Sequence, residues 1–272
     1  MRNTIGLLLV PLMIGLIAAT ISLPASPGEG QSRPKLDCQK MALDYAKALE
    51  SFDYQTAVRL KGQPYSKEEE SEMKKLQKDP EAKKIFAALV EIIRLFPKIG
   101  EIPDWVTEVK TEYQHIQGND LIEMHGDFVF KENNWIIQEL EPRGGETLTE
   151  ETKAQYAGDL SPAPPEGQKI IDAGFGALIT KLIAAVQQKS SNGVSETGAF
   201  PGDVGLNSSD PPAKREKVLK MLSQFPSIGP IPAPAKSFRL GLTGSLSGKD
   251  SEAEIGFQWP KNQLKIAFVN FK

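Results

Sequence analysis

Eight residues decide how this chain is organised: Phe96-Pro97-Lys98-Ile99-Gly100-Glu101-Ile102-Pro103. The pattern F-P-x-I-G-x-I-P recurs 129 positions later as Phe225-Pro226-Ser227-Ile228-Gly229-Pro230-Ile231-Pro232. In both copies the proline ends a preceding helix and the glycine permits a chain reversal. We therefore expect the octapeptide to be a structural connection whose isoleucines cap the core, with an interaction loop as the alternative.

The match extends well beyond the octapeptide. Applied without a gap, the same offset aligns apolar residues on both sides of it: Leu89 with Val218, Ile93 with Leu222, Phe128 with Phe257, Phe130 with Trp259 and Ile137 with Ile266. A short match can arise by chance, but chance does not keep one register over so many positions. The sequence thus predicts a tandem duplication of one structural unit.

Helical periodicity comes first in each half. A first helix is expected over 36–52 and again over 167–186, from apolar residues at helical spacing. Ser66-x-x-Glu69 predicts a capped polar helix, and Asp79-Pro80 predicts the start of a helix that ends at the octapeptide. The stretch 189–210 is rich in Gly, Ser and Pro, so a loop is expected where the first half has its polar helix.

Strand alternation follows each octapeptide. Apolar residues occupy odd positions along 105–117 and even positions along 122–130. The two apolar sets share a face of the sheet only if the residue numbers of each directly paired couple add up to an odd number. A two-residue Gly118-Asn119 turn of type II′ pairs residue 117 with residue 120, so each couple sums to 237. A third strand pairs Trp135 with Phe130. Along the closing strands of the two halves, the residues expected on the inward face are Trp135, Ile137 and Glu139, and Leu264, Ile266 and Phe268.

These patterns predict an α+β fold of two tandem copies of a module, in which helices precede an antiparallel meander and a curved sheet packs on the helices. We place the first module at 36–142 and the second at 167–272, with a Pro-rich linker at 143–166 between them. Residues 24–35 link the first module to the N-terminal segment 1–23.

That segment begins with Met1-Arg2-Asn3 and continues with an uncharged apolar run from Ile5 to Leu23. A positive start, an apolar core and small residues near its end are typical of a secretory signal peptide. The run is also just long enough to remain as a membrane anchor. Either interpretation exports the rest of the chain, so we expect a periplasmic or extracellular protein that contacts a membrane only through residues 5–23, if these are not cleaved.

Charge and cysteine content narrow the classes of partner. With 32 Lys and Arg against 35 Asp and Glu, the chain has no basic excess to attract nucleic acid, so no nucleic-acid partner is expected. Cys38 is the only cysteine, which excludes an intramolecular disulfide. It is interpreted as a tolerated thiol at a helix start, with an intermolecular disulfide as the alternative.

The candidate site residues are polar groups on the predicted inward face, because buried polar groups near a pocket need a partner or a purpose. They are His115, Tyr113 and Glu139, and all three belong to the first module. The alternative is that His115 and Glu139 lie at strand ends and reach water. The two histidines, His115 and His125, fall on opposite faces of the sheet, so no metal site is expected, and no cofactor motif is present.

The order of elements resembles the nuclear transport factor 2-like, cystatin-like superfold. The resemblance rests on the helix end AKALESFDYQTA at 46–57 and on the closing hairpin FVFKENNWII at 128–137. It implies a sheet wrapped around helices and a conical pocket, which serves binding in some members and catalysis in others. The catalytic dyads of its enzyme members do not carry over, because no aligned His and Asp positions are present.

We therefore expect an exported, non-enzymatic binding or interaction protein of the cell envelope or secretome. Its partner would be an envelope protein or a small ligand held in the cleft between sheet and helices. One alternative is an enzyme that acts on a small molecule in the polar cleft of the first module. The other is a structural assembly component linked through Cys38.

Overall fold

The computed structural model describes residues 33–94, 96–117, 120–147, 149, 165–229, 231, 235–259 and 263–272. Its contacts divide the chain into Met1–Ser32 and one compact unit, Arg33–Lys272. The predicted signal peptide or anchor at 1–23 lies outside the described residues. Among the helices that the structure describes, none has the length together with the apolar composition needed to cross a membrane.

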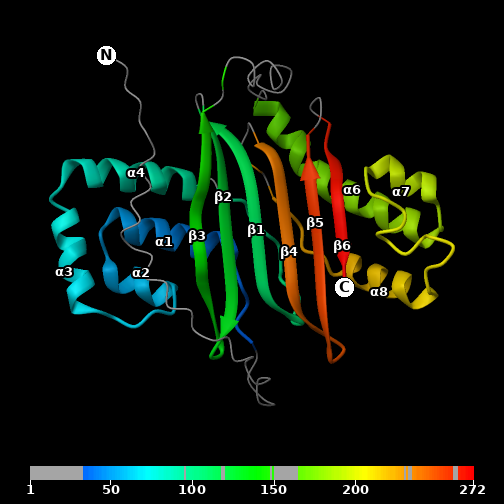
Figure 1. Ribbon diagram of the computed structural model, residues 1–272, viewed down its shortest axis with the longest axis horizontal. Helices are drawn as coiled ribbons and strands as arrows, with labels where there is room; N and C mark the ends of the chain where they lie inside the picture. Colours follow the sequence, from blue (N-terminus) through cyan, green and yellow to red (C-terminus); the bar gives the residue numbers. More distant parts are fainter. Residues whose placement is uncertain are drawn as a thin grey trace. The chain divides into compact units, whose positions relative to one another are not determined.

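The unit is α+β, as predicted, with helices before an antiparallel meander in both halves. The first half contains α1 (Cys38–Glu50), α2 (Tyr54–Leu60), α3 (Lys67–Leu76), α4 (Pro80–Arg94), β1 (Val106–Gln117), β2 (Asp120–Lys131) and β3 (Asn134–Thr147). The second contains α6 (Pro165–Gln187), α7 (Ser191–Thr197), α8 (Pro212–Ser223), β4 (Ala235–Leu246), β5 (Lys249–Gln258) and β6 (Lys265–Phe271). All six strands form one sheet, in the order β3-β2-β1-β4-β5-β6 (Figure 1).

Local capping explains where several helices begin. The Ser66 hydroxyl accepts a hydrogen bond from the amide of Glu69, and the Asp79 carboxylate accepts one from Glu81 at 2.9 Å, as the sequence predicts. The expected loop at 189–210 instead contains α7. Ser190 caps the start of this short helix, and Gly198, with φ at 98°, ends it in the left-handed conformation.

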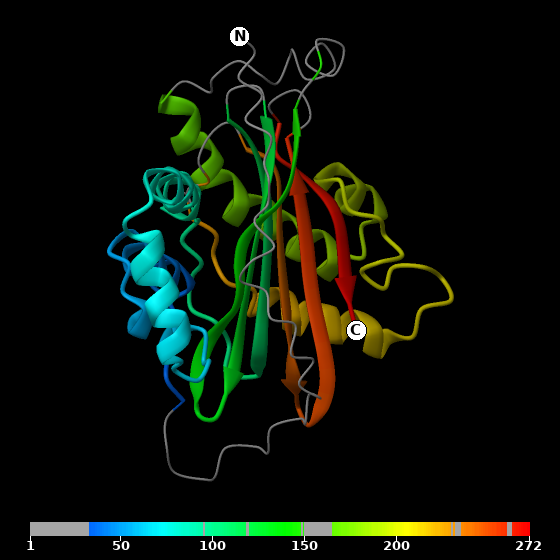
Figure 2. The same cartoon turned by 60° about the vertical axis from the view of Figure 1, so that its left-hand side comes forward.

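The helices lie on one side of the sheet. In Figure 1 the strands pass in front of α1 and α6, and Figure 2 shows α1–α4 beside the same face. Residues on that face are buried, including Val109 and Tyr113 of β1 and Met124 and Phe128 of β2, all at 0% exposure. One hydrophobic core runs through both halves of the unit. No described helix covers the other face, which we call the open face.

The predicted register of the first hairpin is confirmed. Val109 pairs with Phe128, Tyr113 with Met124 and Gln117 with Asp120, so each pair sums to 237. Gly118 and Asn119, with their predicted turn type, lie outside the described residues. Phe130 also pairs with Trp135, as expected.

A bulge then overturns part of the prediction. Phe128 pairs with Ile137, but the preceding residue Asp127 pairs with Glu139, so Gln138 is an extra residue in β3. The extra residue turns Glu139 to the open face and places Leu140, 4% exposed, in the core. The expectation that Glu139 faces inward is therefore wrong.

The second half repeats this irregularity. Phe257 pairs with Ile266, whereas Gly256 pairs with Phe268, so Ala267 is the extra residue in β6. Phe268 is thereby turned to the open face, and its predicted inward position is also wrong. The bulges occupy corresponding places in the two closing strands.

The two halves meet through β1 and β4 and through the two octapeptides. Thr111 of β1 lies opposite Leu240 of β4, and Ile99 forms an isolated antiparallel bridge with Ile228. Both isoleucines are 5% exposed, which agrees with their expected role as caps of the core. In each of these pairs the second residue lies 129 positions after the first. Because β1 and β4 hydrogen-bond to each other, neither half leaves that strand edge unpaired.

Candidate functional site on the open face

The structure does not bring the predicted site residues together. The Tyr113 side chain is fully buried in the core and donates a hydrogen bond to the carbonyl oxygen of Ile92 at 3.1 Å. Burial raises the pKa of the Tyr113 hydroxyl above its ordinary value. Glu139 lies on the opposite face, and the side chain of His115 is outside the described residues. Tyr113 and Glu139 therefore cannot act on one substrate group.

Cys38 is equally inaccessible. It is the first residue of α1 and is 1% exposed. Burial, followed by the neighbouring Asp37 carboxylate, raises the pKa of its thiol. An intermolecular disulfide through Cys38 would require this part of the core to open. The assembly hypothesis loses its main structural support.

The open face is polar, as expected for the solvated side of an antiparallel sheet, and most of its charged groups are carboxylates. The register assigns the following side chains to it: Glu108, Lys110, Glu112, Gln114, Glu123, His125, Asp127, Glu139, Glu141, Arg239, Glu252 and Glu254. We use the name acidic region for Glu108, Glu112, Glu123, Asp127 and Glu139 on the neighbouring strands β1, β2 and β3.

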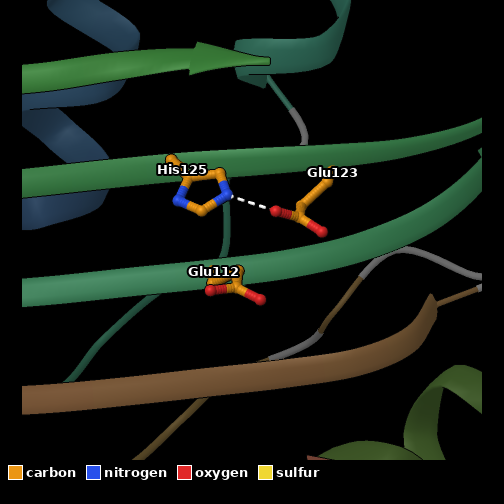
Figure 3. A group of neighbouring side chains, drawn as sticks. All are labelled: Glu112, Glu123 and His125. Atoms are coloured by element: carbon orange, nitrogen blue, oxygen red, sulfur yellow. Dashed lines mark hydrogen bonds and ion pairs between the residues drawn. The ribbon is translucent and has the colours of Figure 1, made fainter. Parts of the chain in front are cut away.

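Three side chains converge within this face (Figure 3). Glu112 of β1 lies directly opposite His125 of β2, and Glu123 precedes His125 by two positions on the same strand. One ligand atom from each residue lies within 4.8 Å of the others. His125 Nε2 is 2.5 Å from Glu123 Oε1, and both side chains are partly exposed. Two carboxylates and an imidazole nitrogen thus face a common point that solvent can reach.

Neighbouring groups orient the two glutamates. Gln114 Nε2 donates a hydrogen bond to Glu123 Oε2 at 2.8 Å. Burial by itself would raise the pKa of Glu123, but the hydrogen bonds from Gln114 and His125 outweigh it and lower that pKa. On the other side of the cluster, Arg239 Nη1 lies 3.4 Å from Glu112 Oε2. The cluster therefore presents two carboxylates to the open face, and that of Glu112 also contacts an arginine.

Arg239 is itself held by more than one partner. Its Nε donates to Glu254 Oε1 at 2.5 Å, and its guanidinium lies 5.5 Å from the ring centroid of Phe268. The bulge in β6 is what places this ring on the open face.

A second group of carboxylates lies beside the cluster. Asp127 is directly opposite Glu139, and like charges in this position destabilise a sheet. Burial is the largest cause that raises the pKa of Asp127; Glu139 adds to it, and Lys110 partly opposes it. Glu139 forms an ion pair with Arg143, while its Oε1 is buried without a hydrogen-bond partner among the described residues.

Sequence reasoning missed both groups because it searched the inward face. The predicted sum of 237 already pairs Glu112 with His125, so that signal was present in the sequence. The signal for Asp127 and Glu139 was absent, because the bulge at Gln138 has no marker residue.

No family model matches this chain, and neither a curated protein nor a solved structure matches it.

Proposed function

We propose that this chain is an exported, non-enzymatic binding protein whose binding surface is the open face of its sheet. The acidic region is the part of that face that contacts the partner. The partner is a cationic ligand or a basic segment of another envelope protein. This replaces the cleft between sheet and helices, where the described side chains form a packed core.

The observation that carries the proposal is the crowding of carboxylates on β1, β2 and β3. Asp127 and Glu139 oppose each other across paired strands, and Asp127 is half-buried with a raised pKa. A solvated face needs no such pair, since separated charges solubilise it equally well. A cationic partner would offset the repulsion, and complementary charge would guide its association.

Export is supported by the N-terminal sequence alone. Met1-Arg2-Asn3 and the apolar run from Ile5 to Leu23 have the layout of a signal peptide, or of an anchor if cleavage does not occur. We place the protein in the periplasm or outside the cell.

We also propose that the fold arose by tandem duplication of one module. Four observations support this: the 129-residue offset in sequence, the pairing of Ile99 with Ile228, the pairing of Thr111 with Leu240, and the matching bulges of β3 and β6. The order of helices followed by a meander supports the resemblance to the nuclear transport factor 2-like, cystatin-like superfold as part of the same proposal.

Site-specific photocrosslinking tests the binding surface. A photoreactive residue is introduced at Lys110, whose side chain is 56% exposed on the open face, and as a matched control at Lys83, exposed on α4. Crosslinking is carried out in the native host with a metal chelator present. We expect a discrete adduct from Lys110 that weakens with added salt, and none from Lys83. Adducts from Lys83 alone, or from neither position, would overturn the proposal.

A further inference from the structure

We infer that Glu112, Glu123 and His125 form a binding site for a late first-row divalent cation, of which Zn²⁺ is the representative. The inference names one ligand class of the open face and so rests on the proposed function.

The geometry requires only small side-chain movements. The three ligand atoms lie within 4.8 Å of one another, whereas ligand atoms around a tetrahedral zinc ion are about 3.3 Å apart, given metal–ligand distances of about 2.0 Å. The backbones of Glu112 and His125 are fixed by direct pairing of β1 with β2. Rotation about side-chain bonds is therefore enough to close the site (Figure 3).

The donor set selects the class of cation. Mg²⁺ and Ca²⁺ prefer sites built from oxygen ligands alone, whereas one imidazole nitrogen with two carboxylates suits zinc and its neighbours. The site faces the open side of the sheet, so water can complete the coordination. Gln114 acts from outside the ligand set, because its hydrogen bond to Glu123 Oε2 leaves Oε1 directed at His125.

Two existing contacts compete with the cation. His125 Nε2 and Glu123 Oε1 must exchange their mutual contact for bonds to the metal. Arg239 must release Glu112, but it keeps its hydrogen bond to Glu254 when it does so. Because the competing pair with Glu112 is partly exposed and 3.4 Å long, its loss costs little.

The test is calorimetric titration of the full chain, purified from its host and stripped with chelator, with ZnCl₂ alone. We expect one equivalent to bind. His125→Gln and Glu112→Gln should each weaken binding at least tenfold, whereas Glu252→Gln, on the same face but away from the cluster, should change it less than twofold. Thermal unfolding without metal verifies that each variant is folded.

Imidazole ¹⁵N spectra provide a second measurement on the unmodified protein. Zinc should shift the Nε2 resonance of His125 and leave that of His115 in place. No binding, or binding that survives His125→Gln unchanged, would overturn the inference. The crosslinking from Lys110 is done with chelator and so does not depend on zinc. An adduct from Lys110 together with absent zinc binding would therefore contradict the metal site but not the proposed binding surface.

Discussion

The backbone amide of Gly100 donates a hydrogen bond to the carbonyl oxygen of Ser227 at 2.7 Å, and the amide of Gly229 donates one to Lys98 at the same distance. These reciprocal bonds hold the two octapeptides together where the halves meet. Gly100 has no room for a side chain, because a Cβ there would overlap Ser227 Oγ and lie 3.0 Å from its backbone nitrogen.

Gly100→Ala should therefore destabilise the protein by about 1–3 kcal/mol, the range for an overpacked core. Ser227→Ala in the same chain should recover part of that loss, since it removes Oγ but not the backbone nitrogen. Urea unfolding followed by tryptophan fluorescence measures both. Gly176→Ala is the control. Gly176 is exposed in α6 and has nothing within 4 Å of an added Cβ, so the substitution should raise the free energy of unfolding by about 0.5–1 kcal/mol. Equal losses at Gly100 and Gly176 would contradict this packing.

The Cys38 thiol should be protected from reagents while the protein is folded. It is 1% exposed, and its raised pKa keeps it in the unreactive thiol form. A thiol-reactive chromophore should label it only as fast as the helical layer opens, and at once in concentrated urea. Non-reducing electrophoresis should show a monomer band. Complete labelling of the folded protein within the mixing time would contradict the burial of the Cys38 thiol.

Asp127→Asn should stabilise the protein at neutral pH. The folded state raises the pKa of Asp127 above its ordinary value of 3.8, mainly through burial, so ionisation is harder in the folded than in the unfolded chain. This cost is absent below the ordinary pKa, grows as the pH rises from the ordinary pKa to the folded one, and is constant above the folded pKa. Because solvent screens the half-exposed carboxyl, we expect a gain of up to about 1 kcal/mol at pH 7.

That gain should vanish near pH 3, where both states bind the proton. Urea unfolding of the wild-type and Asp127→Asn proteins at the two pH values measures it. Asp250→Asn, an exposed change in the hairpin of β4 and β5, controls for the loss of one negative charge. A gain for Asp127→Asn that persists at low pH would have to come from another cause.

Arg239→Gln should strengthen zinc binding. The substitution removes the cation that competes for Glu112, and an exposed ion pair of about 0.4–1 kcal/mol corresponds to a two- to fivefold gain in affinity. The same titration with ZnCl₂ measures it, with Lys272→Gln as a control for the lost positive charge, since Lys272 pairs with Glu252 instead. Weaker binding would mean that Arg239 positions Glu112 for the metal rather than competing for it.

Part of the fold and of the candidate site can be predicted from the sequence, because local sequence patterns determine it. Alternation and a two-residue turn determine the pairing of β1 with β2, and with it the position of Glu112 opposite His125. Capping residues mark the starts of α3 and α4 in the same way.

The rest of the fold depends on bulges and on pairing between distant strands, which local periodicity does not predict. One extra residue, Gln138 in β3 or Ala267 in β6, reverses the face of the side chains that directly follow it, and neither residue type favours a bulge. The pairing of β1 with β4 is a contact between distant strands, so the alternation within either strand says nothing about it. The predicted inward positions of Glu139 and Phe268 were wrong because of these bulges. The single sheet was not predicted because it depends on the pairing of β1 with β4.

The pairing of Thr111 with Leu240 has a consequence for how such a sheet can evolve. Two identical modules in a symmetric dimer would carry the same residue on both sides of this axis, so every substitution would act twice. In the proposed duplication, joining the modules in one polypeptide lifts that constraint and keeps the two partners at a high effective concentration. One side of the sheet can then accumulate carboxylates, with Glu139 at the bulge, while the other keeps the aromatic Phe268 in the corresponding place. The proposed duplication thus allows the two halves of one sheet to present different side chains on the open face.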